Sequence, residues 1–340
     1  MERDRHSWGG QHQVTLQDVA KLAGVSQSAA SVVLNGARSG TRVSAEKRRS
    51  VLEAAANMGY RPNAVARSLI TGRTHRIGVY TGQFSLNAGN FFFADLLGGV
   101  LTGATSMGVN TMIHTSGRGE HQLLDLVSNR SVDGLIVHAT EKDPILPLLG
   151  ELRIPAVAVV DRIDGLPSVV TDDAAGGTVL AQHLAALGHR NVLVKSTRGG
   201  QRSAFARIEA FKAAADQLGM RTTSGSASST DEDGMDQTDI QIVTSGKDRA
   251  TAIFGWSDFV SRQICEKLLS IGVLIPGTVA VVGFDGFDGL SSPRFQITTI
   301  RAHWAKVAEE AAYVLNALIL GKDVPAVTTI PIDFIRGNTT

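Results

Sequence analysis

Residues 14–35 read VTLQDVAKLAGVSQSAASVVLN, a stretch with two short helical patterns on either side of a glycine. Gly24 can take a positive φ and end the first helix, and Ser26 is a candidate side-chain cap for the second. In each helix the apolar residues recur at helical spacing and form one stripe: Leu16, Val19, Ala20 and Ala23 in the first, and Ala29, Ala30, Val33 and Leu34 in the second. This arrangement is typical either of a helix-turn-helix, whose second helix enters the DNA major groove, or of an αα-hairpin within a core.

The charge of the chain is divided unevenly between a short head and a long body. Residues 1–76 contain twelve Lys and Arg against five Asp and Glu, a net charge of +7. Residues 77–340 contain twenty-one against twenty-seven, a net charge of −6, and the two parts sum to the +1 of the whole chain. A basic head on an acidic body indicates that only the head meets phosphates. The length of 340 residues and the hydrophobic fraction of 43% allow two or three domains with a sizeable core.

Cysteine usage and the N-terminus point to the cytoplasm. Cys265 is the only cysteine in the sequence, so neither an intrachain disulfide nor a cysteine metal cluster is possible, as expected in a reducing compartment. The polar start MERDRHSWGGQHQ lacks the apolar run of a signal peptide, and no segment reaches the roughly 18 apolar residues of a membrane span. We therefore expect a cytoplasmic protein without a membrane partner, with residues 1–13 as a flexible arm.

Further helical segments follow the opening pair. Residues 45–58 have helical periodicity, with Ser44 placed as their cap, so a third helix is expected to close a small core. Pro62 suits the first turn of one more helix, although a helix this short is marginal in water. We assign residues 14–60 to a helix-turn-helix domain and residues 61–75 to a hinge helix and linker.

From Arg76 onward, short β-rich runs alternate with helical periods, as in RIGVYTG before the period 92–107 and NVLVKS before 202–218. Strands that alternate with helices imply βαβ units and parallel sheets. The number of units implies two α/β lobes, and ligands in such folds bind at the carboxyl ends of strands. The polar, acidic residues 222–241 are expected to form mostly a solvated loop, and residues 120–128 a helix.

The head, the hinge and the double α/β body together resemble the LacI/GalR family of bacterial transcription regulators, from about Val14 to Gly337. The helix-turn-helix and the hinge RPNAVARSL are specific in combination, whereas either alone is a weak match. The segments that carry the resemblance are, in chain order, VTLQDVAKLAGVS, VSAEKRRSVLEAAANMGYRPNAVARSL, NFFFADLL, VDGLIV, DRIDGLPSVVTDD, HLAALGHRNV, RIEAFKAAA, AVVGFDGF, TTIR and RGN. The resemblance implies an all-α helix-turn-helix DNA-binding head on an α/β two-lobed body of the periplasmic-binding-protein-like type I fold, with parallel sheets.

This resemblance also implies that residues 76–340 form an effector-binding and dimerisation domain. Its first lobe is expected to span about 76–170 and 300–322, and its second about 171–299 and 323–340. A homodimer presents two recognition helices to successive half-sites in the major groove. The expected partner is therefore a near-palindromic double-stranded operator DNA.

By the same resemblance, hinge residues 63–69 fold fully only on DNA, where Leu69 enters the minor groove between base pairs and kinks the duplex. The alternative for Leu69 is an ordinary leucine that packs one helix against another. Arg67 is placed to add a phosphate contact. Arg38 and Arg42 are placed similarly, in a loop about three residues longer than in the lac-type member.

In the recognition helix, Gln27 and Ser28 match the positions that usually read base edges, since a Gln amide can bond adenine N6 and N7. Many relatives carry a larger polar side chain at Val32 and Thr at Ala29. Val32 cannot donate a hydrogen bond, so it either touches a thymine methyl or packs inward, which leaves one base preference in each half-site open. The residues that match phosphate-contacting positions, and so fix the register, are Thr15, Leu16, Ser26, Ser31, Asn35, Tyr60 and Asn63.

Matched motifs place the effector pocket between the lobes, with Asp161 from VVDR, Arg207 from RIEAF and Asp285 from GFDG. Two carboxylates and an arginine fork suit vicinal hydroxyls, so the expected effector is a small neutral carbohydrate or a related metabolite. The other expected lining residues are Asn90, Phe92, Trp256, Ser257, Asp258 and Trp304, of which the two tryptophans are candidate platforms for the C–H face of a sugar.

Purely structural roles are compatible with the same residues. Asp285 can cap the turn that follows it, and Asp161 and Arg207 can form an ion pair with each other. Trp304 can belong to the core of its own helix, against residues three and four positions further on.

Three classes of function compete. An enzyme is disfavoured because the sequence lacks GxSxG, P-loop, HExxH and GxGxxG motifs and its nine histidines show no metal-ligand spacing, so no catalytic residue, metal or cofactor is expected. An extracytoplasmic-type sugar-binding protein shares the body but lacks the basic head, and a regulator controlled by a protein partner is the third class. The favoured function is a nucleoid-associated repressor whose operator affinity a metabolite controls allosterically, with inducer and corepressor action both left open.

Overall fold

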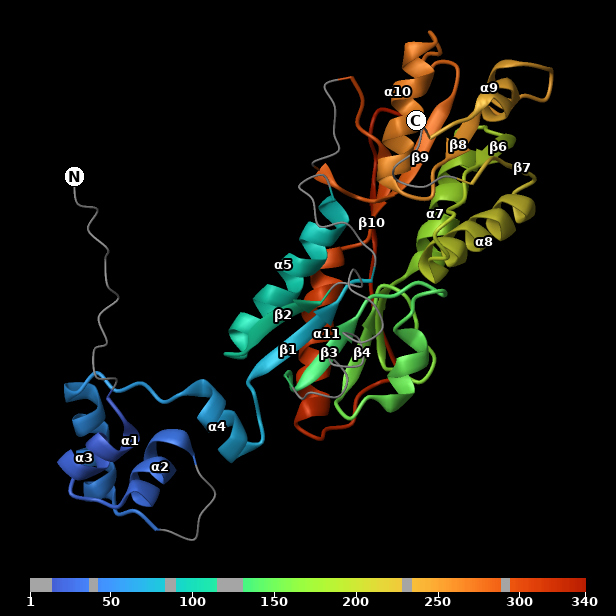
Figure 1. The fold of residues 1–340 in the computed structure, drawn as a ribbon. Helices are drawn as coiled ribbons and strands as arrows, with labels where there is room; N and C mark the ends of the chain where they lie inside the picture. Colours follow the sequence, from blue (N-terminus) through green and yellow to red (C-terminus); the bar gives the residue numbers. More distant parts are fainter. Residues whose placement is uncertain (1–13, 37–41, 83–89, 115–130, 228–233, 289–293) are drawn as a thin grey trace, which may run out of the picture. The chain divides into compact units, whose positions relative to one another are not determined.

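The computed structural model describes residues 14–36, 42–82, 90–114, 131–227, 234–288 and 294–340. It divides into two compact units on either side of the His75–Arg76 bond (Figure 1). The N-terminal unit is a helical head and the C-terminal unit is an α/β body, which confirms the predicted fold class. The arm 1–13, Arg38 and the helix expected at 120–128 lie outside the described residues.

The head begins with three short helices that side chains cap. They are α1 (Leu16–Leu22), α2 (Gln27–Asn35) and α3 (Ala45–Asn57). Thr15 and Asp18 form a capping box on α1, and the hydroxyls of Ser26 and Ser44 accept backbone N–H bonds at the starts of α2 and α3. Such caps satisfy amides that a helix start leaves unpaired. Gly24, at a φ of +64°, makes the turn between α1 and α2, so the predicted helix-turn-helix is confirmed.

The head has its own apolar core where the three helices meet. Val19, Ala30 and Val51 are fully buried there, one from each helix. The stripe that the helical period predicted therefore faces inward. A fourth helix, α4 (Ala64–Thr71), contacts α2, and the Asn63 side chain caps its first turn at 3.4 Å from the N–H nitrogen of Ala66.

The body contains two six-stranded sheets, one in each lobe (Figure 1). The first has the order β11-β5-β4-β3-β1-β2 and the second β12-β10-β9-β8-β6-β7. Among the described strands, only the pairing of β10 with β12 is antiparallel. The first sheet consists of β1 (Arg76–Tyr80), β2 (Asn110–His114), β3 (Gly134–Val137), β4 (Ala156–Val159), β5 (Ser168–Thr171) and β11 (Val327–Ile330). The second consists of β6 (Asn191–Val194), β7 (Arg221–Ser224), β8 (Ala252–Phe254), β9 (Ala280–Asp285), β10 (Thr298–Arg301) and β12 (Asp333–Ile335).

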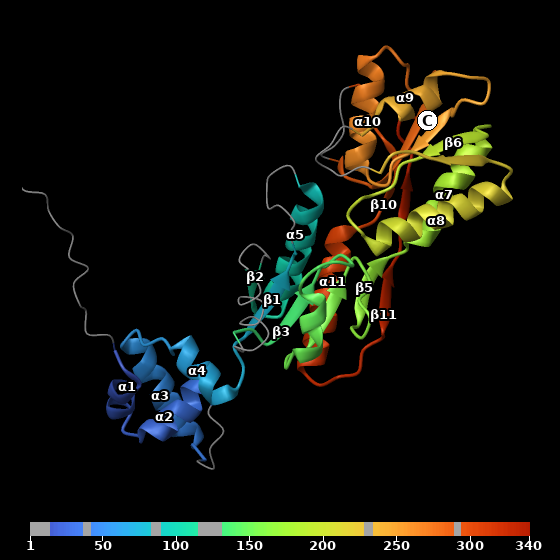
Figure 2. The same ribbon diagram turned by 45° about the vertical axis from the view of Figure 1, so that its right-hand side comes forward.

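Helices connect successive strands and cover the sheets, which is the βαβ arrangement that the sequence predicted. The first lobe has α5 (Phe91–Ser106), the 3-10 helix η1 (Leu146–Glu151) and α11 (Trp304–Ile319). The second has α7 (Asp173–Ala186), α8 (Arg202–Gln217), α9 (Gln237–Thr244) and α10 (Asp258–Ser270). Figure 2 shows α7 and α8 side by side. Within the described ranges, no helix is both long enough and apolar enough to cross a membrane.

One expectation about the body was wrong, and another needs a refinement. Residues 323–340 do not all belong to the second lobe, because β11 pairs in parallel with β5 and covers what would otherwise be an open edge of the first sheet. The loop expected at 222–241 has most of β7 at its start and the first residues of α9 at its end, and residues 228–233 of it lie outside the described residues. Asp239 of α9 forms a buried ion pair with Lys195, which follows β6. A polar composition alone does not reveal that such a charge has a buried partner.

Glycine and alanine allow α5 and α11 to pack closely in the first lobe. A Cβ atom added at Gly99 would lie 2.0 Å from the carbonyl oxygen of Ala305, and one at Gly103 would lie 2.9 Å from Cβ of Ala312. Gly98 is exposed, and an added Cβ there meets nothing within 4 Å. Two adjacent glycines of one helix therefore face opposite environments.

We expect Gly98→Ala and Gly99→Ala to change stability in opposite directions. Alanine at position 98 should stabilise the body by about 1 kcal/mol, because an exposed helix interior prefers alanine to glycine. Alanine at position 99 pushes α11 away and should destabilise the body by about 3 kcal/mol, as overpacking does. Differential scanning calorimetry of the body's transition measures both changes, and shifts of the same sign would contradict the described packing.

Candidate functional site

The first candidate site is the exposed start of α2 in the head. Ser26, Gln27 and Ser28 are exposed there, and the Ser26 and Ser28 hydroxyl oxygens lie 3.0 Å apart. Ser26 also caps the N–H of Ala29, and Ala30 anchors the helix in the core. The first residues of the second helix of a helix-turn-helix contact base edges. The Gln27 amide is therefore free to reach a base while the helix that carries it is fixed.

The residues expected at the phosphates differ in exposure. Thr15, Ser26, Arg42 and Asn63 are exposed, whereas Leu16, Ser31 and Tyr60 are half-buried, as is Val32. Asn35 is buried, and its Nδ2 donates to Ser31 Oγ at 3.3 Å, so its side chain stays within the head. The contacts of these residues with DNA stay predictions.

Helix α4 carries the two hinge residues. Leu69 is 82% exposed, so it is not a packing leucine among the described residues. Arg67 is half-buried, and its carbonyl oxygen accepts a hydrogen bond from Thr71 Oγ1 at 2.9 Å. An exposed leucine on a basic head fits the apolar wedge of a minor-groove binder, and that role stays a prediction.

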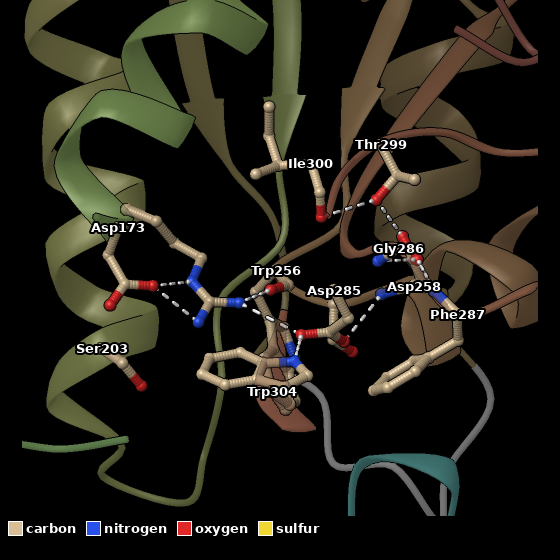
Figure 3. Close-up of polar contacts among 12 residues, drawn as sticks. Asp173, Ser203, Trp256, Asp258, Asp285, Gly286, Phe287, Thr299, Ile300 and Trp304 are labelled. Atoms are coloured by element: carbon tan, nitrogen blue, oxygen red, sulfur yellow. Dashed lines mark hydrogen bonds and ion pairs between the residues drawn. The ribbon is translucent and has the colours of Figure 1, made fainter. Parts of the chain in front are cut away.

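The second candidate site surrounds the buried side chain of Arg207 in the body (Figure 3). Its Nε and Nη2 atoms donate to Asp173 Oδ1 at 2.9 and 2.7 Å, and its Nη1 donates to the carbonyl oxygen of Trp256 at 3.1 Å. The guanidinium carbon lies 3.7 Å from the ring centre of Phe284. These contacts offset the desolvation of the charge, which an unpaired buried arginine would pay in full.

Close packing of α7 on α8 brings Asp173 to Arg207. A Cβ atom at Gly177 of α7 would lie 2.1 Å from the carbonyl oxygen of Arg207, so only glycine permits this approach. Asp172 caps α7 at 3.0 Å from the N–H nitrogen of Ala175, while the next residue, Asp173, turns to the guanidinium. The structure thus pairs Arg207 with Asp173 and not with Asp161.

Asp285, at the end of β9, joins the same network. Its Oδ1 lies 3.6 Å from Arg207 Nη1 and accepts a hydrogen bond from Trp304 Nε1 at 3.2 Å, and its Oδ2 accepts one from the N–H of Asp258 at 3.3 Å. Trp304 is 1% exposed and belongs to the largest core cluster, so it matches the helix-core alternative. Because Trp304 begins α11 of the first lobe, its hydrogen bond links the two lobes.

Ser257 and Asp258 shape the protein around the site. Ser257 caps the first turn of α10. Asp258 accepts hydrogen bonds from the backbone N–H groups of Gly286 and Phe287 at 2.7 and 3.2 Å and from Thr299 Oγ1 at 2.6 Å (Figure 3). Because these bonds occupy both carboxylate oxygens, Asp258 holds the loop after β9 and thereby positions Asp285.

Asp161 follows β4 on a strained turn. Val160 has a φ of +73°, and the N–H of Asp161 donates to the carbonyl oxygen of Val159 at 2.9 Å, which is a γ-turn that β-branched residues rarely adopt. The Oδ1 of Asp161 then accepts a hydrogen bond from the N–H of Ser203 at 2.7 Å. Asp161 therefore reaches from the first lobe to the start of α8 in the second.

Asn90 and Phe92 lie at the start of α5. The Asn90 side chain accepts a hydrogen bond from the N–H of Phe93 at 3.1 Å and caps this helix. The Phe92 ring meets the rings of Trp304 and His138 at angles of 82° and 62°, with centroids 5.2 and 5.4 Å away. Phe92 is thus beside the Arg207 network, as expected, whereas Asn90 has a capping contact.

Several buried polar atoms at the carboxyl ends of strands have no hydrogen-bond partner among the described residues. They include Thr81 Oγ1 after β1, His114 Nε2 at the end of β2, Asp161 Oδ2 after β4, Thr171 Oγ1 at the end of β5 and Trp256 Nε1 after β8. Folded proteins rarely leave buried polar atoms unpaired, so this edge is where further hydrogen bonds can form. The sequence did not single out Thr81, Thr171 or Asp173, whose only signal is a place at the end of a predicted strand.

Burial raises the pKa of three carboxyls in this network. The pKa of Asp173 rises to about 7, because burial outweighs the lowering effect of Arg207. Burial also raises the pKa of Asp285 to about 8 and that of Asp258 to about 6. One arginine does not balance three buried carboxylates, so the network holds protons near neutral pH. A protonated carboxyl donates a hydrogen bond as well as accepting one.

Both units of the chain are similar to known regulatory proteins. Residues 15–63 match the family described as bacterial regulatory proteins, lacI family, and residues 181–340 match a periplasmic binding protein-like domain. The HTH-type transcriptional repressor PurR of Photobacterium profundum is 27% identical over 321 residues, which cover 91% of this chain and 93% of that protein.

Solved structures share the fold. The Lac repressor dimer bound to operator and the anti-inducer ONPF has a TM-score of 0.77 at 24% identity, over 96% of this chain and 98% of that one. The complex of the transcriptional regulator CelR with cellobiose has a TM-score of 0.67 at 24% identity, over 96% of this chain and 100% of that one. These similarities confirm the head and the two-lobed α/β body.

The raised carboxyl pKa values predict a body that loses stability as the pH rises from 6.5 to 8.5. A carboxyl whose pKa is higher in the folded than in the unfolded state stabilises the fold by binding a proton, and this contribution is lost as the pH rises through the folded pKa. Burial lowers the pKa of His138, so this histidine changes stability only below about pH 6.5. We expect a loss of about 2 kcal/mol, or about 5 °C in the midpoint, mainly from Asp285.

Differential scanning calorimetry at the two pH values measures this loss. The Asp285→Asn variant has no carboxyl to titrate and should lose most of the pH dependence. Asp288→Asn, at a side chain that is 90% exposed, is the matched control and should keep it. An unaltered pH dependence in Asp285→Asn would show that Asp285 carries no proton in the folded protein.

Proposed function

Because the chain belongs to the LacI family of bacterial regulatory proteins, we propose that it is a sequence-specific transcriptional repressor whose operator affinity is set by a small metabolite. The observation that carries this proposal is the exposed Ser26–Ser28 turn of α2 on a rigid, capped three-helix core. The +7 charge of residues 1–76 supplies the attraction to phosphates that such a reader needs. The protein then works on the nucleoid, in the cytoplasm, and no catalytic step is assigned to it.

A homodimer is the assembly that fits this function. Two heads related by a two-fold axis read two half-sites, so the operator is near-palindromic. The named solved relative, the Lac repressor, is a dimer on its operator. In the hinge, Leu69 supplies an exposed apolar side chain for the minor groove and Arg67 supplies charge for the DNA backbone, and Arg42 adds charge from the loop before α3.

The Arg207 network is the proposed effector site, and a carbohydrate is the proposed effector. The guanidinium group of this network donates hydrogen bonds and its carboxyl groups accept them, all within a small volume. The aromatic rings of Phe92, Phe284 and Trp304 lie beside these groups. Sugars present hydroxyls to polar groups and C–H faces to rings, so this combination suits them. The solved complex of CelR, a protein with this fold, holds cellobiose.

Allosteric control follows if the effector favours one arrangement of the two lobes. Asp161 and Trp304 each make a hydrogen bond across the lobes, so a ligand that competes with these bonds changes the balance between arrangements. Linkage requires the operator and the effector to change each other's affinity by the same factor. Both inducer and corepressor action use this connection.

The recognition helix is tested by two variants with different expected signatures. Gln27→Ala removes a base contact and should change the preferred sequence, at a cost of about 1–3 kcal/mol on the native operator. Arg67→Ala removes a phosphate contact and should weaken binding to all sequences alike. It should also reduce the slope of the logarithm of the binding constant against the logarithm of the salt concentration by about one. Selection of sites from random DNA, followed by titrations at several salt concentrations, measures both. If Gln27→Ala leaves the preferred sequence unchanged, α2 does not read bases as placed here.

The effector site is tested by calorimetric titration with a panel of mono- and disaccharides, purines and amino acids. Arg207→Lys keeps the charge but loses the planar fork and should weaken the best sugar at least about tenfold. Arg262→Lys, on the exposed face of α10, is the matched control and should bind as the unaltered protein does. Tight binding of a purine or an amino acid and of no sugar would overturn the carbohydrate assignment.

A further inference from the structure

A carboxylate of the protein occupies the planar fork of Arg207. The Nε and Nη2 atoms of the guanidinium donate to the same oxygen of Asp173, at 2.9 and 2.7 Å. On its other side, Nη1 donates to the carbonyl oxygen of Trp256 at 3.1 Å and lies 3.6 Å from Asp285 Oδ1 (Figure 3). An arginine fork is also the group that commonly binds the carboxylate or phosphate of a small molecule. In this site the protein itself has taken the fork that Nε and Nη2 form.

The charge of Asp173 exceeds what Arg207 needs. Asp258 and Asp285 belong to the same network, and burial raises the pKa of Asp258 to about 6 and that of Asp285 to about 8. At pH 8 the ionised Asp258 therefore balances one guanidinium before Asp173 is counted. Burial raises the pKa of Asp173 to about 7, so this carboxyl is also mostly ionised at pH 8. The four side chains together then carry a net negative charge.

An asparagine at position 173 would accept the same two hydrogen bonds. Its amide oxygen has the shape and the lone pairs of the carboxylate oxygen that receives Nε and Nη2. The geometry of the fork therefore does not require an acid, and what the aspartate adds is its charge. A surplus charge in a buried site is costly. The gain that fits this cost is selectivity, because a site can reject a ligand by presenting it with a like charge.

A negatively charged effector meets such repulsion in the Arg207 network. Asp173 and Asp285 lie on opposite sides of the guanidinium, and both are buried, where water screens charges little (Figure 3). A hydroxyl group carries no charge and can donate to Asp285 Oδ2, which receives one N–H, from Asp258, and has a second lone pair. An uncharged sugar therefore gains a hydrogen bond where its acid derivative meets a like charge.

We propose that Asp173 sets the charge class of the effector. By occupying the fork of Arg207 and balancing its charge, Asp173 admits uncharged sugars and excludes their acidic and phosphorylated derivatives. This inference rests on the proposed effector role of the Arg207 network. The protein then distinguishes a sugar from the product of its own phosphorylation, since the phosphoryl group brings a negative charge.

Pairs of probes that differ mainly in charge test the proposal on the full-length protein. They are glucose with glucuronate, galactose with galacturonate and mannose with mannuronate, in which a carboxylate replaces one CH₂OH group. Calorimetric titration at pH 8 should show the sugar binding at least about tenfold more tightly than its uronate in any pair that binds. A uronate that binds as tightly as its sugar would overturn the proposal.

Two variants assign this preference to one carboxylate. Asp173→Asn keeps the oxygen that receives Nε and Nη2 and removes the charge, so the uronate should gain at least about tenfold relative to its sugar. Asp216→Asn removes an equal charge from the exposed end of α8 and is the matched control, whose preference should equal that of the unaltered protein. A preference that Asp173→Asn leaves unchanged would refute the role of Asp173.

Sulfate makes the test independent of which sugar the protein binds. The Trp304 indole donates to Asp285 at 3.2 Å, so its resonance in protein with ¹⁵N-labelled tryptophan reports an anion beside Arg207. Sulfate should shift this resonance saturably in Asp173→Asn and leave it unshifted in the unaltered protein. A shift in both proteins, or in neither, would contradict the proposal. If Asp173→Asn does not fold, a saturable shift in the unaltered protein is the contradicting result.

The two proposals fail in different experiments. Absence of binding by every sugar would count against the carbohydrate effector and would not alter the sulfate result. Binding of a sugar together with equal binding of its uronate would keep the carbohydrate effector and remove the charge selectivity assigned to Asp173.

Discussion

The buried guanidinium of Arg207 is the interaction on which the geometry of the body depends. Its partners come from separate elements: Asp173 from α7, the carbonyl of Trp256 after β8, and Asp285 from β9. A buried charge that loses its partner costs several kcal/mol, so the start of α7, the segment after β8 and the end of β9 are constrained to meet beside the guanidinium. Asp285 then accepts the hydrogen bond of the Trp304 indole, which begins α11 of the first lobe. The buried charge of Arg207 therefore holds elements of the second lobe together and, through Asp285, also positions the contact with the first lobe.

Local rules predicted the elements well, because a helix cap and a period depend on neighbours in the chain. Ser26, Gly24 and the apolar stripes of 14–35 are sufficient to define α1 and α2. Contacts distant in sequence were harder to predict. Asp172 and Asp173 are the same residue type at adjacent positions, and only the packing of α7 on α8 decides which one caps and which one reaches Arg207. Similarly, β11 has strand periodicity in the sequence, but its sheet is chosen by the free edge of β5.

The site residues show the same division between what a local pattern predicts and what distant contacts decide. Motif resemblance brought Arg207, Asp285 and Phe92 to one place, but it could not distinguish a ligand-facing carboxylate from one already occupied. Asp258 is occupied by two backbone amides and Thr299, whereas Asp161 keeps one oxygen without a partner among the described residues. That difference depends on where amides of other segments lie, which no sequence pattern encodes. The strained turn at Val160 is equally hidden, because valine gives no sign that it will adopt a positive φ.

The contacts between the lobes are of unequal strength, and this decides where a ligand can act. The pairs that Arg202 makes with Glu141 and Asp164 involve exposed side chains, and such pairs contribute at most about 1 kcal/mol. The Trp304–Asp285 and Ser203–Asp161 hydrogen bonds are buried, and a hydrogen bond in the protein interior is stronger than one that water surrounds. A ligand shifts an equilibrium only by its difference in affinity for the two states. Competition for the Asp285 or Asp161 oxygens therefore changes the arrangement of the lobes far more than any contact with the Arg202 pairs.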